Sequence, residues 1–110
     1  MTLPVLPSYK HYQHNLLAMQ SGDAKRLWRK AIKEANNYEC IYCGKPHHES
    51  DLTIDHVHPR LLGGSNITRN CVPACVECNQ SKGSAYWLDW FRDNFPPDPF
   101  RENRILSWIK

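Results

Sequence analysis

The sequence lacks the features that mark membrane and secreted proteins. Its apolar stretches fall well short of the roughly 20 residues that a helix needs to span a bilayer. Residues 1–7 contain neither the basic segment nor the apolar run of a secretory signal. We therefore expect a cytoplasmic protein with no membrane partner. Internal repeats and low-complexity segments are also absent.

A strong excess of charge of one sign is lacking too. A net charge of +3 over 110 residues does not by itself identify a nucleic-acid-binding protein, because basic side chains must cluster to attract a phosphate backbone. A chain of this length is expected to form one domain, and it buries only about two-thirds of its unfolded surface. Its core is therefore modest, and additional cross-links would stabilise it.

The five cysteines are an odd number, which argues against a framework of disulfides in a chain without a secretory signal. Four of them form two Cys-x-x-Cys pairs, Cys40 with Cys43 and Cys75 with Cys78. This spacing lets each pair chelate a single ion, and four thiolates leave no open position on a tetrahedral zinc. We therefore expect a structural zinc; the alternative is four buried or redox-active cysteines. Cys71 is expected to be a small buried side chain.

The densest polar motif lies between the two cysteine pairs. A short alternating run places Leu52, Ile54 and His56 on one face and Thr53, Asp55 and Val57 on the other, which predicts a half-buried strand that Pro59 ends. Asp55 and His56 then lie together at the strand end. A carboxylate beside an imidazole combines a hard oxygen ligand for a metal with a group that takes a proton near neutral pH. His58 either approaches the substrate or is a surface or capping residue.

An amphipathic helix is predicted over residues 23–36, with Asp23 at its N-terminus and Asn36-Asn37 at its end. One face is apolar, and the other carries lysines and arginines. This basic face is either a solvated surface or, beside a phosphate-handling site, a surface that contacts DNA phosphates. We favour the second interpretation and assign the contact to Lys25, Arg29 and Lys33.

Other elements are predicted from local patterns. A short helix is expected within residues 1–22, a second strand around residues 70–73, and a helix that begins at the second cysteine pair. Two more helices are predicted over residues 84–94 and 100–110, with their aromatic stripes in the core. The single domain therefore divides into a helical region with the basic helix (1–37), a zinc-containing core (38–83) and C-terminal helices (84–110).

The segment from Cys40 to Gly83 resembles the HNH endonucleases that carry a four-cysteine zinc site. The resemblance rests on the two cysteine pairs, on the Asp-His-Val-x-Pro pattern from Asp55 to Pro59, and on Asn79-x-x-Lys82-Gly83. It implies a small α+β fold: a ββα-metal core held by the zinc, with flanking helices. More weakly, residues 87–108 are similar to the C-terminal extension of some small stand-alone HNH proteins.

The resemblance also implies residue roles. His56, Asn70 and Asn79 occupy the three positions that give the family its name. His56 would be the general base, Asp55 and Asn79 would hold one divalent cation, and Asn70 would hydrogen-bond the loop that carries His56. With Asp and Asn in place of histidine ligands, Mg²⁺ or Mn²⁺ is expected at the active centre rather than Zn²⁺ or Ni²⁺.

The implied function is metal-dependent hydrolysis of phosphodiester bonds in DNA, with Lys82 and Arg60 as phosphate contacts. One active centre hydrolyses one strand, so a duplex cut needs a second centre, as in a homodimer, or a second visit. The alternative is a non-catalytic nucleic-acid-binding module held together by zinc. A decayed nuclease would be expected to lose Asp55, His56 or Asn79, and all three are present.

Overall fold

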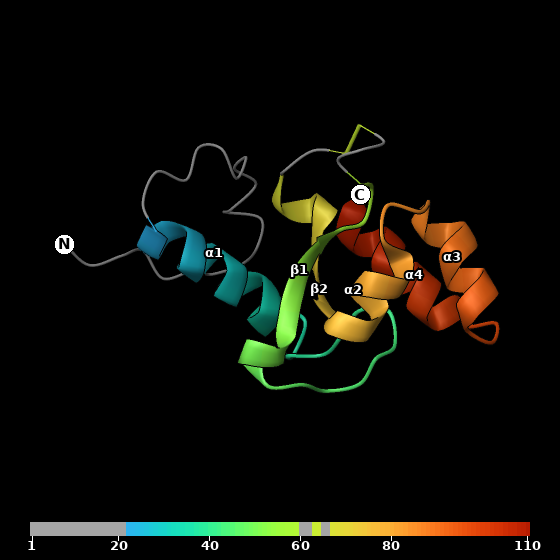
Figure 1. Ribbon diagram of the computed structural model, residues 1–110, viewed down its shortest axis with the longest axis horizontal. Coiled ribbons are helices and arrows are strands. Elements are labelled where there is room, and N and C mark those ends of the chain that lie inside the picture. Colours follow the sequence, from blue (N-terminus) through green and yellow to red (C-terminus); the bar gives the residue numbers. More distant parts are fainter. Residues whose placement is uncertain (1–21, 60–62, 65–66) are drawn as a thin grey trace.

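The computed structural model describes residues 22–59, 63–64 and 67–110 (Figure 1). The short helix expected near the N-terminus and Arg60 lie outside the described residues. Within the described part of the chain, no helix is long and apolar enough to cross a membrane.

The centre of the fold is an antiparallel pair of strands, β1 (Leu52–His56) and β2 (Cys71–Cys75). The register places Leu52 opposite Cys75 and His56 opposite Cys71. Helix α2 (Val76–Lys82) follows β2 without a loop and packs against both strands. Every residue of β2 is buried, including Cys71, as expected. The two strands and the helix confirm the predicted ββα core.

Helix α1 (Gly22–Ala35) confirms the predicted amphipathic helix and lies at one end of the molecule (Figure 1). Its buried residues, Trp28 and Ile32, are one turn apart and face β2. The Trp28 indole donates a hydrogen bond of 2.9 Å to the buried Thr68 hydroxyl. The helix ends as predicted, because Asn37 adopts a left-handed conformation with φ of 57°.

Helices α3 (Trp87–Asn94) and α4 (Pro99–Ile109) lie on the other side of the sheet and α2 (Figure 1). Helix α3 begins three residues later than residue 84, where the pattern predicted it, because residues 83–86 make the turn out of α2. Most of their aromatic side chains are in the core, as predicted: Trp87, Trp90, Phe91 and Trp108 are buried. Tyr86, which the pattern placed with them, is exposed because it precedes the first turn of α3.

Helix α4 fastens the C-terminal region to the core. Its Trp108 indole donates to the Cys71 carbonyl at 2.9 Å, and Arg101 donates to the Ile41 carbonyl at 3.3 Å. The Arg101 guanidinium lies so close to Gly44 that a Cβ at Gly44 would collide with it. Residues around the first cysteine pair are therefore held by a helix that lies 60 residues further along the chain.

Candidate metal sites and active site

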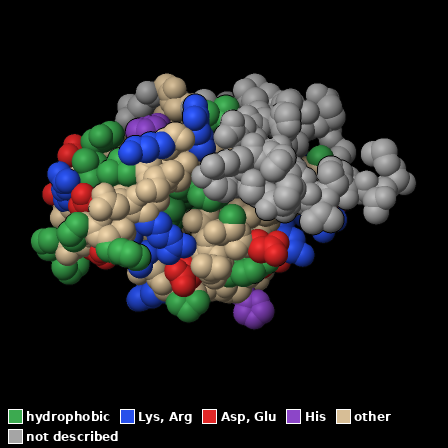
Figure 2. All heavy atoms as spheres, turned by 180° about the vertical axis from the view of Figure 1, so that it is seen from behind, with side chains coloured by type: hydrophobic (Ala, Val, Ile, Leu, Met, Phe, Trp, Pro, Cys, Tyr) green, Lys and Arg blue, Asp and Glu red, His purple; other side chains and the backbone are tan. Residues whose placement is uncertain are grey.

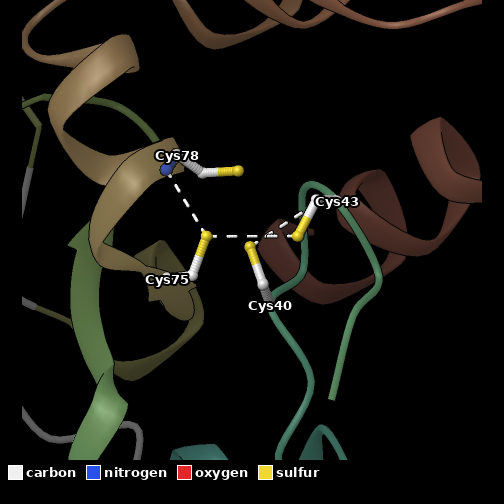
Figure 3. Close-up of side chains that lie close together, drawn as sticks. All are labelled: Cys40, Cys43, Cys75 and Cys78. Carbon is white, nitrogen blue, oxygen red and sulfur yellow. Dashed lines mark hydrogen bonds between the residues drawn. The ribbon is translucent and has the colours of Figure 1, made fainter. Parts of the chain in front are cut away.

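The two cysteine pairs converge on one point. Their four sulfur atoms all lie within 4.8 Å of one another and face a common space (Figure 3). Thiolates bound to one zinc at about 2.3 Å are about 3.8 Å apart, and the Cys43 and Cys75 sulfurs are 4.0 Å apart. Cys75 and Cys78 come from the start of α2, where the Cys75 sulfur also caps the helix by accepting from the Cys78 amide. The four cysteines therefore form a site that could hold a zinc ion.

The electrostatics of this cluster favour a cation. The hydrogen bond with Cys78 lowers the pKa of the Cys40 thiol to about 4. Burial raises the pKa of Cys43 to about 11, and the hydrogen bond with Cys40 raises the pKa of Cys78. The cluster by itself thus stabilises one thiolate, and a divalent ion would supply the charge that lets the other thiols ionise.

Asp55 is held at the junction of three segments. Its side chain is buried, and its Oδ2 atom accepts a hydrogen bond of 2.6 Å from the Tyr42 hydroxyl. The same oxygen forms an ion pair of 3.1 Å with the Lys82 ammonium. Tyr42 comes from the loop between the first two cysteines and Lys82 from the last turn of α2. The carboxylate therefore has a defined orientation at the base of the site.

Lys82 occupies the interior rather than the surface. Its side chain has 0% exposure, and its ammonium donates a further hydrogen bond of 2.9 Å to the His56 carbonyl. The phosphate contact expected from the sequence does not fit this position, because the ammonium would have to leave both Asp55 and His56 to reach a ligand. The sequence reveals a lysine near the end of a helix, but not that the helix turns it inward.

Asn79 reaches the same side of β1 as Asp55. Its amide nitrogen donates to the Thr53 hydroxyl at 2.8 Å, and Thr53 and Asp55 share a strand face because they are two residues apart. Asn79 and Lys82 likewise lie on one face of α2. The bond to Thr53 uses the amide nitrogen of Asn79, so the bond leaves the amide oxygen available as a ligand. Carboxylate and amide oxygens are the ligands that Mg²⁺ and Mn²⁺ prefer, so this pair of donors suits such an ion.

Asn70 holds the backbone directly after His56. Its side-chain oxygen accepts from the His58 amide at 2.9 Å, and its side-chain nitrogen donates to the His58 carbonyl at 3.1 Å. Its own carbonyl accepts from the Val57 amide at 2.9 Å. His56 is half-buried at the end of β1, whereas His58 is exposed. Asn70 therefore holds the backbone that follows His56, and its role in positioning a general base stays a prediction.

Two further residues lie beside this segment: Gly64, from the Gly-Gly pair that follows the strand in the sequence, and Arg69, which was not identified from the sequence. Gly64 donates to the Pro59 carbonyl at 2.8 Å, and a Cβ at this position would collide with the His58 carbonyl. Exposed Arg69 lines an open hollow of about 430 Å³ together with His58 and Asn70. Any signal for Arg69 in the sequence is weak, because a lone arginine before a strand is common on protein surfaces.

Only part of the basic face of α1 is exposed to solvent. Lys25 and Arg29 are exposed, but the Lys33 ammonium donates to the Glu49 carbonyl at 2.8 Å, and burial lowers the pKa of Lys33. Lys33 thus has a structural contact in place of the expected phosphate contact. Figure 2 shows basic side chains in separate groups among acidic and apolar ones on the face that it displays.

The fold and the sites together define a small α+β protein with a ββα core, flanking helices and a four-cysteine site that could hold zinc. Residues 40–89 match the sequence profile of a family described as HNH endonuclease. The CRISPR-associated endonuclease Cas9 of Corynebacterium diphtheriae is 35% identical over 86 residues, which are 77% of this chain and 8% of that protein.

Two further comparisons agree. The SPbeta prophage-derived protein YoqL of Bacillus subtilis, named as a candidate HNH endonuclease, is 30% identical over 113 residues, which cover 90% of this chain and 44% of YoqL. The crystal structure of the Type II-C Cas9 enzyme from Actinomyces naeslundii shares the fold, with a TM-score of 0.55 and 22% identity over 76% of this chain and 10% of that one.

These matches identify the family. Residues 40–89 of the chain belong to the HNH endonuclease family, as the motifs predicted. The chain spans less than half the length of the relatives that it matches.

Proposed function

We propose that the chain is a metal-dependent DNA endonuclease in which His56 is the general base and Asp55 and Asn79 hold Mg²⁺ or Mn²⁺. The observation that carries the proposal is the placement of Asp55 and Asn79 on the contact between β1 and α2, next to His56 at the strand end. The proposal assigns these oxygen donors and the adjacent His56 imidazole to one phosphodiester at the strand end, because hydrolysis needs both a metal site and a general base.

The chain's own residues would each have a distinct role around the substrate. His56 would accept the proton of the water that attacks phosphorus, and Asn70 would keep the adjoining backbone in place. Tyr42 and Lys82 would hold the Asp55 carboxylate. A divalent ion bound by Asp55 and Asn79 would neutralise charge on the phosphate and on the departing 3′ oxygen.

DNA is proposed as the substrate because of the family and because exposed Arg69 borders the hollow next to His58. Lys25 and Arg29 add exposed cations on α1. Such side chains contact phosphates without reading sequence. A single centre of this kind nicks one strand; cutting both strands would need a homodimer or a second encounter.

Cleavage of supercoiled plasmid with and without Mg²⁺ or Mn²⁺ tests the proposal. His56→Ala should lower the rate by about a hundredfold or more, since general-base catalysis contributes that much. His48→Ala is the matched control, because His48 is an exposed histidine outside the proposed site. A His56→Ala protein that cuts at the wild-type rate would refute the proposed base. Plasmid that is bound but not cut with either metal would favour the non-catalytic binding module.

A further inference from the structure

We propose that Tyr42 is a positioning residue that couples the four-cysteine site to the candidate catalytic metal. The inference rests on the proposed function, because it takes Asp55 as a ligand of that metal. Tyr42 stands between Cys40 and Cys43 in the sequence, and its hydroxyl donates to Asp55 Oδ2 at 2.6 Å. One residue of the cysteine loop therefore reaches the proposed ligand directly.

The position of the Tyr42 ring is determined by its surroundings. The residue has 0% exposure, and its ring meets Trp90 edge to face, with centroids 5.1 Å apart and an interplanar angle of 83°. Trp90 is in turn anchored to α2, because its indole donates to the Ser81 hydroxyl at 3.0 Å. The hydroxyl is thus presented to Asp55 by packed neighbours on two helices.

The backbone on which Tyr42 stands is organised by the cysteines. Cys40 and Cys43 flank it on both sides, and the Ile41 amide donates to the Pro73 carbonyl at 3.0 Å in β2. An ion held by all four thiolates would fix this loop relative to the start of α2. Release of that ion would free the loop of residues 40–43, and the Tyr42 hydroxyl would no longer be held against Asp55.

The contacts of Asp55 show how Tyr42 would orient the carboxylate. The Tyr42 hydroxyl and the Lys82 ammonium both approach Oδ2, and neither of these two donors occupies Oδ1. Two donors on one oxygen hold the rotation of the carboxylate, and under the proposal the other oxygen, Oδ1, is the one that would bind the metal. Partners that orient a metal ligand in this way typically change metal affinity by about 10- to 100-fold when they are removed.

Mn²⁺ binding to the zinc-loaded full chain, measured by calorimetry, tests the inference without relying on cleavage. Tyr42→Phe keeps the ring and removes only the hydroxyl. It should retain its zinc and bind Mn²⁺ about tenfold or more weakly than the wild type. Tyr86→Phe is the matched control, because Tyr86 is 47% exposed and lies away from Asp55 at the start of α3. Its Mn²⁺ affinity should equal that of the wild type.

The outcomes separate the two proposals. If Asp55→Asn loses Mn²⁺ binding while Tyr42→Phe binds Mn²⁺ like the wild type, the coupling is refuted and the proposed function stands. If Asp55→Asn binds Mn²⁺ normally, the metal centre itself is refuted. A hydroxyl that only stabilises the fold would lower the unfolding midpoint of Tyr42→Phe without changing the Mn²⁺ affinity of the folded chain, and this result also overturns the coupling.

A measurement on the wild type guards against a Tyr42→Phe protein that fails to fold. Coupling between two sites is reciprocal for equilibrium affinities, so saturating Mn²⁺ should raise the zinc affinity of the chain in competition with a zinc-selective chelator. Zinc content is measured by metal analysis after equilibration at graded chelator concentrations. An unchanged zinc affinity in the presence of Mn²⁺ would refute the coupling.

Discussion

The buried ion pair between Lys82 and Asp55 offers a direct test of how the strand end is held. Lys82→Met keeps most of the side-chain volume and removes the ammonium, which has 0% exposure and contacts Asp55 at 3.1 Å and the His56 carbonyl at 2.9 Å. Asp55 is left as a buried charge with the Tyr42 hydroxyl as its remaining donor among these contacts. Removing one partner of a buried pair in this way costs about 3–5 kcal/mol.

That loss is large for this domain. Domains are stable by about 5–15 kcal/mol in total, so Lys82→Met should remove about a fifth or more of the free energy of unfolding. The melting temperature should fall by about 12–20 °C at about 4 °C per kcal/mol. Urea unfolding of the zinc-loaded chain, without Mg²⁺ or Mn²⁺, can be followed by the fluorescence of its buried tryptophans.

Two comparisons make the test specific. Lys45→Met is the matched control, because Lys45 is exposed and its loss should change stability by no more than about 0.5 kcal/mol. The double variant Asp55→Asn with Lys82→Met removes both charges and should be more stable than Lys82→Met alone. If Lys82→Met unfolds within about 1 kcal/mol of the wild type, or if the double variant is no more stable than the single one, the pair does not hold the strand end.

Three further predictions follow from the cysteines and the basic helix. Metal analysis after dialysis should find about one zinc per chain. Cys75→Ser should lose both the zinc and the folded state, as measured by circular dichroism, because metal binding is part of the folding free energy. A folded, zinc-free chain would contradict this. Burial raises the pKa of Cys71 to about 12, so its thiol stays protonated and unlabelled by a thiol reagent at pH 8 until the chain unfolds. Because the pKa of Cys71 is higher in the folded chain than in the unfolded one, its contribution to the free energy of unfolding is full below pH 9 and declines as the pH rises toward 12. Rapid labelling of Cys71 in the folded chain would refute its burial. Replacing Lys25 and Arg29 by alanine should weaken binding to all DNA sequences alike and reduce the slope of log affinity against log salt by about one per lost contact, whereas an unchanged slope would mean that this face is merely solvated.

The sequence by itself determined the local and chemical features of the protein. Cys-x-x-Cys spacing, the alternation around Asp55 and His56, and the helical period of residues 23–36 all reflect short-range geometry. The two cysteine pairs, β1 and α1 could therefore be predicted from residues close together in the chain. The helix boundary at Asn37 could be predicted for the same reason, because asparagine tolerates the left-handed backbone that ends a helix.

Tertiary packing alone decided which partners these residues meet. Tyr42 lies 13 residues from Asp55 in the sequence, and Lys82 lies 26 residues from His56, yet all of them meet where the cysteine loop and α2 close over β1. Lys33 was predicted to contact DNA, but its ammonium donates a hydrogen bond to the backbone carbonyl of Glu49. Local periodicity predicts which face of an element is polar. The neighbour that satisfies a polar group depends on how distant segments pack, because burying the group without a partner is costly.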